Sequence, residues 1–550
     1  DGWREVFVPG LGAGARYGFK VGDLTMPDPA SRHQPDDVHA LSEVVDPLAY
    51  EWADRTWRGR PWSEAVVYEL HVGTFTPEGT FRAAINKLDY LVDLGVTAIE
   101  LMPVAEFPGM RGWGYDGVLL FAPEATYGRP EDMKALVDAA HARGLMVMLD
   151  VVYNHFGPEG NYLHAYARRF FTDRHHTPWG QAVNYDGADA GPVRDFVIHN
   201  ALYWLEEFHL DGLRLDAVHA IRDDSAKTIL VDLAERVRAT FPDRPIHLVL
   251  ENDDNSADLL GAGLYTAQWN DDIHHAMHRL LTGEAGGYYV DYGPDPVAHL
   301  CRCLAEGFAF QGEESPHRRG TRRGQPSAHL PPGAFVAFLQ NHDQIGNRAL
   351  GERIDHLAAE PAVRALTALL LLSPHPPMLF QGEEWGASSP FQYFCDFGPD
   401  LAKAVRKGRK REFEHFPQFQ GKNAAKIPDP VDPAAFLRSK LNWAEPAAEP
   451  FARKLAQVRE LLAIRRREVA PRLAGMTGTE NASCTSQGPH LRAQWTLGDG
   501  SLLSISANFS AAPLPGVVSG GGRLLYSTYG GIGPMPAWGV DWYLDDGGTA

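Results

Sequence analysis

Apolar segments of strand length alternate with longer amphipathic segments between about residues 63 and 465. The short segments are nearly continuous hydrophobic runs, which are typical of parallel strands buried on both faces. These eight runs are AVVYELHV (65–72), TAIELMPV (97–104), LMVMLDVV (145–152), GLRLDAV (212–218), IHLVLEN (246–252), LYTAQWN (264–270), FVAFLQNHD (335–343) and PPMLFQGEE (376–384). Helical periodicity in the segments between them predicts an α/β fold, a (β/α)8 TIM barrel with long loops at one end.

The two ends of the chain follow a different pattern. Residues 1–62 contain two strand-like stretches, WREVFVPG (3–10) and ARYGFKV (15–21), around a glycine-rich link. We expect an N-terminal β-sandwich-like domain here, incomplete because the chain starts as if in the middle of a strand pair. Residues 466–550 include LRAQWTLGDGSLLSISANFS, which alternates apolar and polar positions around a GDG turn. They predict a C-terminal antiparallel β domain and leave 63–465 for the barrel.

Composition and charge exclude several classes of partner. The chain has 550 residues, 44% of them hydrophobic and 22% charged, with a formal net charge of −19. Such an acidic protein is not expected to bind nucleic acid or an anionic membrane, because both need a basic surface. The longest apolar run, ALTALLLLSPHPPMLF, is broken by polar residues and prolines, so no membrane span is expected.

Four cysteines, Cys301, Cys303, Cys395 and Cys484, show neither a disulfide framework nor a zinc spacing. We expect all four to be reduced thiols, which suits a cytoplasmic protein with no signal peptide. We further expect a monomer or a weak dimer.

Polar residues stand at the carboxyl ends of several predicted strands, where the active site of such a barrel lies. The charged and titratable ones are Asp150, Arg214, Asp216, Glu251, His342 and Asp343. Each acid alone could instead cap the following helix. Acids at the same end of neighbouring parallel strands converge on one opening, however, so a shared site is the better interpretation.

The cations among these acids favour glycoside chemistry over metal binding. Retaining glycosidases need one ionised carboxylate and one that holds a proton. Arg214 lies two residues before Asp216, on the same face of a strand, and would keep that carboxylate ionised. Glu251 follows the apolar HLVL and is expected to have a raised pKa, as a general acid requires.

Four segments carry a family resemblance: DVVYNH (150–155), GLRLDAVHA (212–220), LVLEND (248–253) and FLQNHD (338–343). In order and spacing they resemble the signature blocks of the α-amylase family of glycoside hydrolases. The resemblance implies that Asp216 is the nucleophile, that Glu251 is the general acid and base, and that Asp343 stabilises the transition state. It also implies that Arg214 and His342 assist these acids and that Tyr115 stacks under the cleaved sugar. The two working carboxyl groups are expected ~5–5.5 Å apart.

Finer motifs resemble the trehalohydrolase branch of that family, whose members hydrolyse the α-1,4 bond next to a terminal trehalose. These motifs are LENDDN (250–255), QWNDDIHH (268–275), SPHRRGTRRGQPS (315–327) and MLFQGEEWGASSPFQYFCDF (378–397). The implied substrates are maltooligosyl trehalose and related α-1,4-glucans. The full set of predicted substrate-binding residues is Tyr115, His155, Arg214, His219, Asn270, Asp271, Asp272, His274, Asn341, His342 and Gln344.

Several of these assignments have a structural alternative. Asp271 or Asp272 could cap a helix, His219 could be a hydrogen-bonded core histidine, and the HRRG loop (317–320) could be solvated rather than cover the trehalose end. Glu383 and Glu384 are expected behind the residues that touch substrate. Asn154 matches a residue that binds calcium in some amylases, but its loop lacks an evident calcium cage. We therefore expect no cofactor and no required metal.

Two other functions remain open. A 1,4-α-glucan branching enzyme would use the same three acids and transfer the glycosyl group to a sugar hydroxyl. A non-catalytic glycan-binding protein would be marked by loss of one of the acids, and all three are present.

Overall fold

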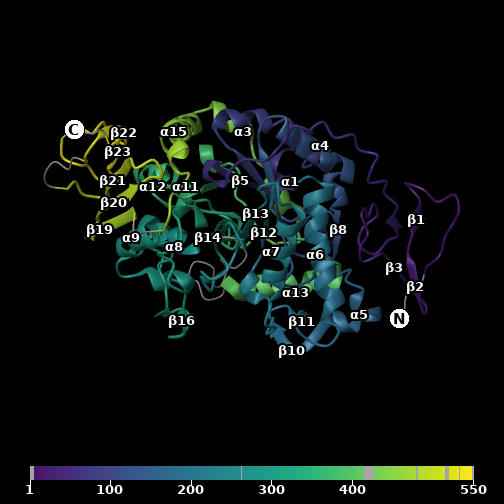
Figure 1. The fold of residues 1–550 in the computed structure, drawn as a ribbon. Helices are drawn as coiled ribbons and strands as arrows, with labels where there is room; N and C mark the ends of the chain where they lie inside the picture. Colours follow the sequence, from purple (N-terminus) through teal and green to yellow (C-terminus); the bar gives the residue numbers. More distant parts are fainter. Residues whose placement is uncertain are drawn as a thin grey trace.

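Eight parallel strands close into a barrel at the centre of the computed structural model (Figure 1). The structure describes residues 5–261, 263–413, 426–478, 481–514, 520–531 and 533–547. In chain order the barrel strands are β5 (Val67–Leu70), β6 (Ala98–Leu101), β9 (Met146–Val151), β12 (Gly212–Leu215), β13 (His247–Leu250), β14 (Ala267–Trp269), β17 (Phe335–Phe338) and β18 (Pro377–Phe380). All eight predicted runs contain one of these strands, so the predicted barrel is confirmed.

Helices cover the outside of the barrel, and along the chain they alternate with the barrel strands (Figure 1). They are α2 (Phe81–Ile85), α3 (Leu88–Leu94), α4 (Pro130–His141), α6 (Ala190–Glu207), α7 (Ile229–Thr240), α8 (Asp271–Thr282), α9 (Pro296–Glu306), α12 (Glu360–Leu372) and α15 (Phe451–Ile464). The long loop after β18 also contains α13 (Pro399–Phe413), which the sequence reading did not identify, and α14 (Pro433–Ser439).

The barrel interior changes character along its axis. Towards the amino ends of the strands it is filled by apolar side chains such as Val67, Met146 and Met148. Towards the carboxyl ends the inward positions become charged, beginning with Glu69 and Glu100, which are register partners in β5 and β6. Successive side chains of a strand alternate between two faces, so Val67 and Glu69 both point inward. One strand can therefore contribute to the core at its amino end and to the site at its carboxyl end.

The N-terminal segment forms two small antiparallel pairs beside the barrel, purple in Figure 1. β1 (Arg16–Tyr17) pairs with β4 (Ser42–Glu43), and β2 (Phe19–Val21) pairs with β3 (Leu24–Met26). The expected strand in WREVFVPG is wrong over its described residues, 5–10, which are exposed and unpaired. A strand needs a neighbour for its backbone groups, and the described chain supplies none there.

The C-terminal residues form a five-stranded antiparallel sheet at the opposite end of the molecule from the N-terminal segment (Figure 1). Its order is β19-β20-β21-β23-β22, with bounds β19 (Ala482–Gln487), β20 (His490–Thr496), β21 (Leu502–Asn508), β22 (Arg523–Ser527) and β23 (Val540–Asp545). The alternation in LRAQWT predicted this correctly: Leu491, Ala493 and Trp495 are buried, and the residues between them are exposed. The indoles of Trp495 and Trp542 donate to the carbonyls of Leu304 in α9 and Ala368 in α12, which seats the sheet on barrel helices.

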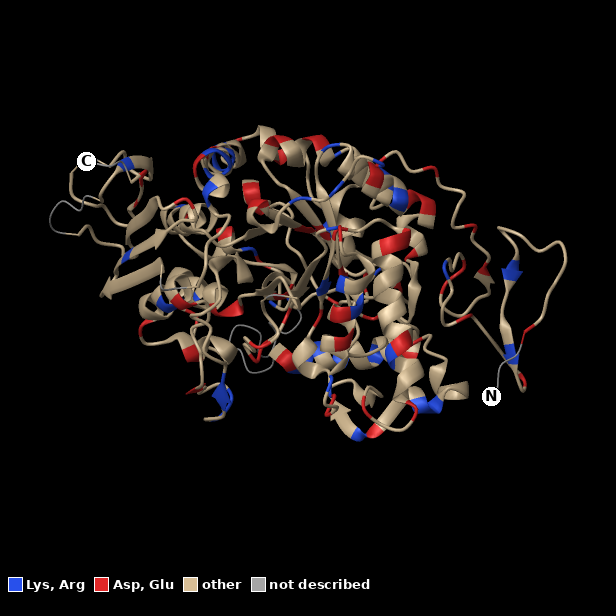
Figure 2. Cartoon of the chain, in the orientation of Figure 1, with Lys and Arg blue, Asp and Glu red and all other residues tan. Residues whose placement is uncertain are grey.

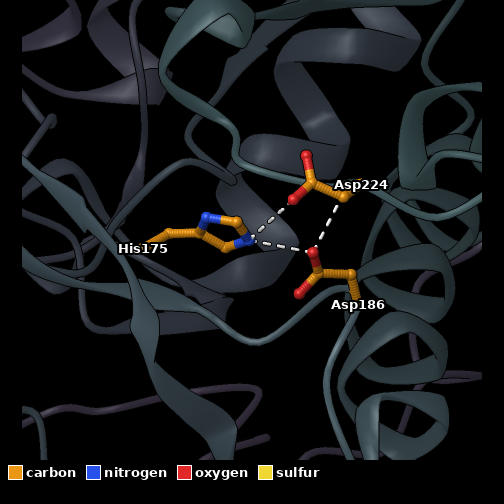
Figure 3. Close-up of side chains that lie close together, drawn as sticks. All are labelled: His175, Asp186 and Asp224. Atoms are coloured by element: carbon orange, nitrogen blue, oxygen red, sulfur yellow. Dashed lines mark hydrogen bonds and ion pairs between the residues drawn. The ribbon is translucent and has the colours of Figure 1, made fainter.

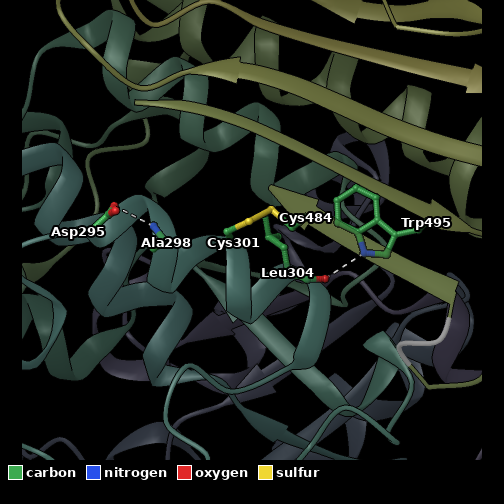
Figure 4. Close-up of a disulfide and its surroundings, with 6 residues drawn as sticks. All are labelled: Asp295, Ala298, Cys301, Leu304, Cys484 and Trp495. Atoms are coloured by element: carbon green, nitrogen blue, oxygen red, sulfur yellow. Dashed lines mark hydrogen bonds between the residues drawn. A yellow bond between two sulfur atoms is a disulfide. The ribbon is translucent and has the colours of Figure 1, made fainter. Parts of the chain in front are cut away.

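One disulfide joins the barrel to this sheet (Figure 4). Cys301 in α9 bonds to Cys484 in β19, with their Cα atoms 5.4 Å apart. The expectation of four reduced thiols is therefore wrong for this pair, whereas Cys303 and Cys395 are buried and free. The two bonded cysteines are 183 residues apart, so only the packing of β19 on α9 reveals the pairing. The argument for a cytoplasmic location from reduced cysteines no longer holds.

Acidic and basic residues are interspersed along the barrel helices (Figure 2). Within the described residues, no helix combines the length and apolar character needed to cross a bilayer.

Candidate active site

The three predicted acids lie at the carboxyl end of the barrel. Asp216 follows β12 directly, Glu251 follows β13 directly, and Asp343 lies in the first turn of the short helix α10 (His342–Gly346), just after β17. All three reach the surface, with 12%, 14% and 44% of their side chains exposed, respectively. Neighbouring strands β12 and β13 are in parallel register, so Asp216 and Glu251 emerge side by side.

Arg214 connects these acids from below. Its side chain is fully buried, and Nη1 donates to Oδ1 of Asp216 at 2.9 Å and to Oδ2 of Asp150 at 2.6 Å. Nη2 lies 3.6 Å from Oε2 of Glu251, and the guanidinium lies 4.0 Å over the ring of Trp269. One guanidinium thus faces both working carboxylates, as the shared strand face of Arg214 and Asp216 predicts.

Asp216 and Glu251 have different surroundings. Asp216 accepts a further hydrogen bond from Nδ2 of Asn154 at 3.2 Å. Glu251 accepts one from the backbone N–H of Ala217 at 2.6 Å. Burial raises the pKa of Glu251, and the neighbouring Asp216 adds to this rise while Arg214 opposes it. The direction agrees with the predicted general acid.

A second group of side chains closes the other side of the opening. The hydroxyl of half-buried Tyr115 donates to Oδ2 of Asp150 at 2.6 Å, and its ring stacks on His342 with centroids 5.0 Å apart. Nε2 of His342 lies 3.5 Å from Oδ1 of Asp343. Burial raises the pKa of Asp150 to about 7, against the opposing effect of Arg214.

Three residues of the WNDDIHH motif do not reach the opening, which corrects their assignment as substrate contacts. Asn270 caps α8 through the N–H of Ile273 and donates to the carbonyl of Gly307. The His274 ring bonds the carbonyl of Leu339 and the hydroxyl of Tyr289. Asp272 is fully buried, with the donors Asn255 Nδ2, Ala309 N, Phe310 N, Tyr292 Oη and Arg323 Nη1.

Asp271, the neighbour of Asp272, faces the acids instead. It is partly exposed, and burial raises its pKa well above the usual range, with Glu251, Asp253 and Asp343 as further causes. Of the four residues predicted from this motif, Asp271 therefore stays a candidate for binding sugar. Asp271 and Asp272 are the first two residues of α8, and consecutive helical side chains point about 100° apart. One can therefore face the acids while the other is enclosed.

Asn341 and Gln344 form a capping box at the start of α10. The Asn341 side chain accepts from the N–H groups of Asp343 and Gln344, and the Gln344 side chain accepts from the N–H of Asn341 at 3.1 Å. Asn341 is buried and used in this cap, so the predicted sugar contact is corrected to a role in holding Asp343. Gln344 is partly exposed.

His155 and His219 lie at the two edges of the site. His155 stacks on Trp179 of the hairpin β10 (Phe171–Thr177) and β11 (Gly180–Val183), with centroids 4.3 Å apart. A hollow of about 160 Å³ opens beside this pair. Burial lowers the pKa of His155, although Asp216 opposes this. The ring of partly exposed His219 accepts from the N–H of Asp253 at 3.2 Å.

The basic loop folds back onto the segment that follows Glu251. Arg318 pairs with Asp253 at 2.5 Å and with Asp254 at 2.6 Å. Arg318 thus anchors the loop beside the segment that follows Glu251, while its neighbours His317, Arg319 and Gly320 are exposed to solvent. Glu383 and Glu384 are buried behind the site as expected; Glu384, for example, accepts hydrogen bonds from Tyr68 and Tyr90.

Glu69 belongs to the site, and Glu100 lies beside it in the same layer; neither was identified from the sequence. Both are buried, and Glu69 is bonded to the backbone and the ring of His342. The available signal was the same one that revealed Arg214: an acid inside an otherwise apolar strand, here in VYEL and AIEL.

Among the described residues, one group of side chains outside the candidate active site has the composition of a metal site. His175, Asp186 and Asp224 place ligand atoms within 4.8 Å of one another and point towards a common centre (Figure 3). Arg174 lies 3.0 Å from Asp186 and 4.0 Å from Asp224. Because Arg174 pairs with both acids, we interpret the group as an ion-pair network that ties β10–β11 to the loop before α7.

Comparisons with known proteins agree with this geometry. The family model described as "Alpha amylase, catalytic domain" matches residues 53–179, and a domain of unknown function matches residues 477–548. The malto-oligosyltrehalose trehalohydrolase of Deinococcus radiodurans is 48% identical over 85% of this chain and 76% of that protein. The Mycobacterium tuberculosis protein of the same name is 46% identical over 85% of this chain and 82% of its own length.

A solved structure covers almost the whole chain. The crystal structure titled putative alpha amylase from Salmonella typhimurium has a TM-score of 0.93 and 48% identity, and the match covers 98% of this chain and 91% of that one. The 1,4-alpha-glucan branching enzyme GlgB 1 of Streptomyces avermitilis is 39% identical, but over only 40% of this chain. By its barrel, its acids and its relatives, the chain belongs to the malto-oligosyltrehalose trehalohydrolases within the α-amylase family.

Proposed function

We propose that the protein is a retaining glycosidase that cleaves the α-1,4-glucosidic bond next to the terminal trehalose of maltooligosyl trehalose and releases trehalose. One observation carries this proposal: the buried guanidinium of Arg214 faces both Asp216 and Glu251 at the carboxyl ends of adjacent strands. Identity of 41–48% to trehalohydrolases over most of the chain supports the substrate.

In the proposed mechanism, the two carboxyl groups take different parts. Glu251, whose pKa is raised, protonates the oxygen of the scissile bond, and trehalose leaves. Asp216, held by Arg214 and Asn154, attacks the anomeric carbon and forms a glycosyl-enzyme. Glu251 is now a base and takes a proton from water, which releases the shortened maltooligosaccharide.

Asp343 has a third part. An oxocarbenium-like transition state carries positive charge at the sugar ring, which a nearby carboxylate stabilises. Asp343 is the most exposed of the three acids and lies beside His342, whose ring stacks on Tyr115. We propose that it binds sugar hydroxyls and strengthens that contact as charge develops.

The proposed substrate contacts are the remaining predicted residues that are partly exposed or line a hollow. The partly exposed ones are Tyr115, His219, Asp271 and Gln344, with the Arg318 loop at the edge. His155 is buried but lines the hollow beside Trp179. We also propose the domain limits 1–62, 63–465 and 466–550, with the first as a carbohydrate-binding-like domain. The start of β5 at Val67 and of β19 at Ala482 supports the two boundaries.

Product analysis separates the proposal from its rivals. The protein is incubated with one defined maltooligosyl trehalose and, in parallel, with amylose. Free trehalose from the first substrate is the expected result. New α-1,6 branches in amylose without trehalose would identify a branching enzyme instead. Unchanged substrates in both, with retained sugar binding, would identify a non-catalytic glycan-binding protein.

A further inference from the structure

A buried carboxylate on β5 holds His342 at two points. Oε2 of Glu69 accepts from the backbone N–H of His342 at 3.2 Å, and Oε1 pairs with Nδ1 of its ring. Both side chains are almost completely sealed, with 1% exposed. Glu69 lies in β5, and His342 begins α10, 273 residues later. The contact therefore fixes both the position and the ring orientation of His342.

The opposite ring nitrogen faces the substrate side. Nε2 of His342 lies 3.5 Å from Oδ1 of Asp343. The imidazole is therefore placed between two carboxylates. A neutral imidazole has only one N–H, so it can donate to one of them; an imidazolium donates to both.

The surroundings of His342 favour the imidazolium. Burial alone would lower the pKa of this histidine, but Asp343 and Glu69 outweigh it and raise the pKa to about 9. Arg214 from β12 opposes the rise. The other titratable and aromatic groups that face His342 from neighbouring elements are Glu100 of β6, His71 after β5, Trp113 and Tyr115 of the loop after β6, and Trp269 of β14.

We propose that Glu69 is a positioning residue for the glycosidase reaction: it keeps His342 as an imidazolium, which in turn holds the carboxylate of Asp343 turned towards the sugar. This inference rests on the proposed function of Asp343. Without the charge on Glu69, the imidazole donates to only one side, and Asp343 loses its fixed cationic neighbour. No bond of the substrate is broken or formed by Glu69 itself.

Glu100 provides a matched control on the adjacent strand. It is the register partner of Glu69 and equally buried, but its Oε1 has no hydrogen-bond partner. Burial, with Asp150 and Glu69 as further causes, raises the pKa of Glu100 well above the usual range. The same layer thus contains one acid that is hydrogen-bonded to His342 and one that is not. Glu100→Gln leaves the pairing of His342 intact, whereas Glu69→Gln removes its counter-ion.

The direct test is histidine NMR on the full chain, which needs no activity. With 15N-labelled histidine, and His342 assigned by the loss of its signals in His342→Gln, both ring nitrogens are expected to be protonated at pH 8 in wild type and in Glu100→Gln. In Glu69→Gln the ring is expected to be neutral at pH 8. A neutral His342 in wild type overturns the proposal, even if Glu69→Gln does not fold, and so does a charged ring in Glu69→Gln.

Kinetics against pH provide the second readout, with maltooligosyl trehalose as substrate. Glu69→Gln is expected to lower kcat about 10–100-fold, to change KM less than threefold, and to move the alkaline limb of kcat to lower pH. Glu69→Asp, which keeps the charge, is expected to restore part of kcat, and Glu100→Gln to leave the limb in place. Equal shifts in Glu69→Gln and Glu100→Gln overturn the proposal. Failure of wild type to release trehalose overturns the proposed function alone, because the NMR result does not depend on it.

Discussion

Asp216 and Asp272 both stand at the start of the segment that follows a barrel strand, yet their surroundings are opposite. Asp216 has Arg214 and Asn154 as side-chain partners and keeps 12% of its side chain exposed. Asp272 has five donors and no exposed surface. A carboxylate whose hydrogen-bonding capacity is saturated by the protein has no lone pair left for substrate, whereas a partly satisfied one at a surface does.

The difference extends to what each acid holds together. Asp216 shares its arginine with Glu251, so its contacts tune the charge of a reacting pair. Asp272 bonds the N–H groups of Ala309 and Phe310, just beyond α9, and α9 carries the disulfide to the C-terminal sheet. One acid therefore belongs to the chemistry and the other to the framework.

The largest effect is expected at Asp216. Asp216→Asn removes the proposed nucleophile without changing its size, so kcat should fall at least about 10³-fold, which is about 4 kcal/mol of transition-state stabilisation. Substrate affinity, measured by calorimetry, should change little. Asp89→Asn, on the exposed face of α3, is the matched control and should keep wild-type turnover. Turnover within about tenfold of wild type in Asp216→Asn would refute the role of nucleophile.

Asp272→Asn should act on stability instead. The amide would place an NH₂ group among donors and remove the buried anion of Arg323, whose other acidic partner, Asp253, is half-exposed; breaking a buried ion pair in this way costs about 3–5 kcal/mol. Denaturant unfolding measures this cost. The protein that remains folded should turn over at close to the wild-type rate. A stable variant with a large loss of kcat would contradict the framework role.

Removal of the disulfide is expected to have a smaller effect of the same kind. Cys484→Ser opens a link between segments 183 residues apart and should lower the free energy of unfolding by about 2–4 kcal/mol. At a temperature well below the unfolding transition, kcat should stay within twofold of wild type. Cys395→Ser, at a buried free cysteine, is the control. Reducing the disulfide should lower the free energy of unfolding of this variant by as much as it does in wild type. A disulfide that controls kcat at low temperature would link the framework to the chemistry and weaken the comparison.

Residue pattern was sufficient to predict the barrel and to place three acids at the carboxyl ends of its strands, and the reason is local. Buried parallel strands are continuous apolar runs, and a charged residue within or just after such a run has few places to go except the interior or the opening. The same logic would have found Glu69 and Glu100. It could not separate Asp271 from Asp272, because both begin a helix and only the docking of the 309–323 segment shows which one is enclosed. The disulfide was missed for a similar reason, since it depends on packing between two domains.

The smallest effect is expected at Asp271, the neighbour of Asp272 that faces the three acids. Burial, together with Glu251, Asp253 and Asp343, raises its pKa well above the usual Asp range, so between the unfolded and the folded pKa the folded protein keeps a proton there that the unfolded chain has lost. The stability contributed by this group therefore falls as pH rises from the unfolded pKa through the raised folded one. Asp271→Asn removes that loss and should become more stable relative to wild type as pH increases.

The same variant also probes sugar binding. An Asn side chain keeps hydrogen-bonding groups of the same size, so KM for maltooligosyl trehalose should rise only a few-fold, with kcat nearly constant. Unfolding curves at several pH values and steady-state kinetics give both quantities from one preparation. A stability loss as large as that of Asp272→Asn would mean that Asp271 is part of the framework too. All of α8, which begins at Asp271, would then belong to the framework, and none of it to the chemistry.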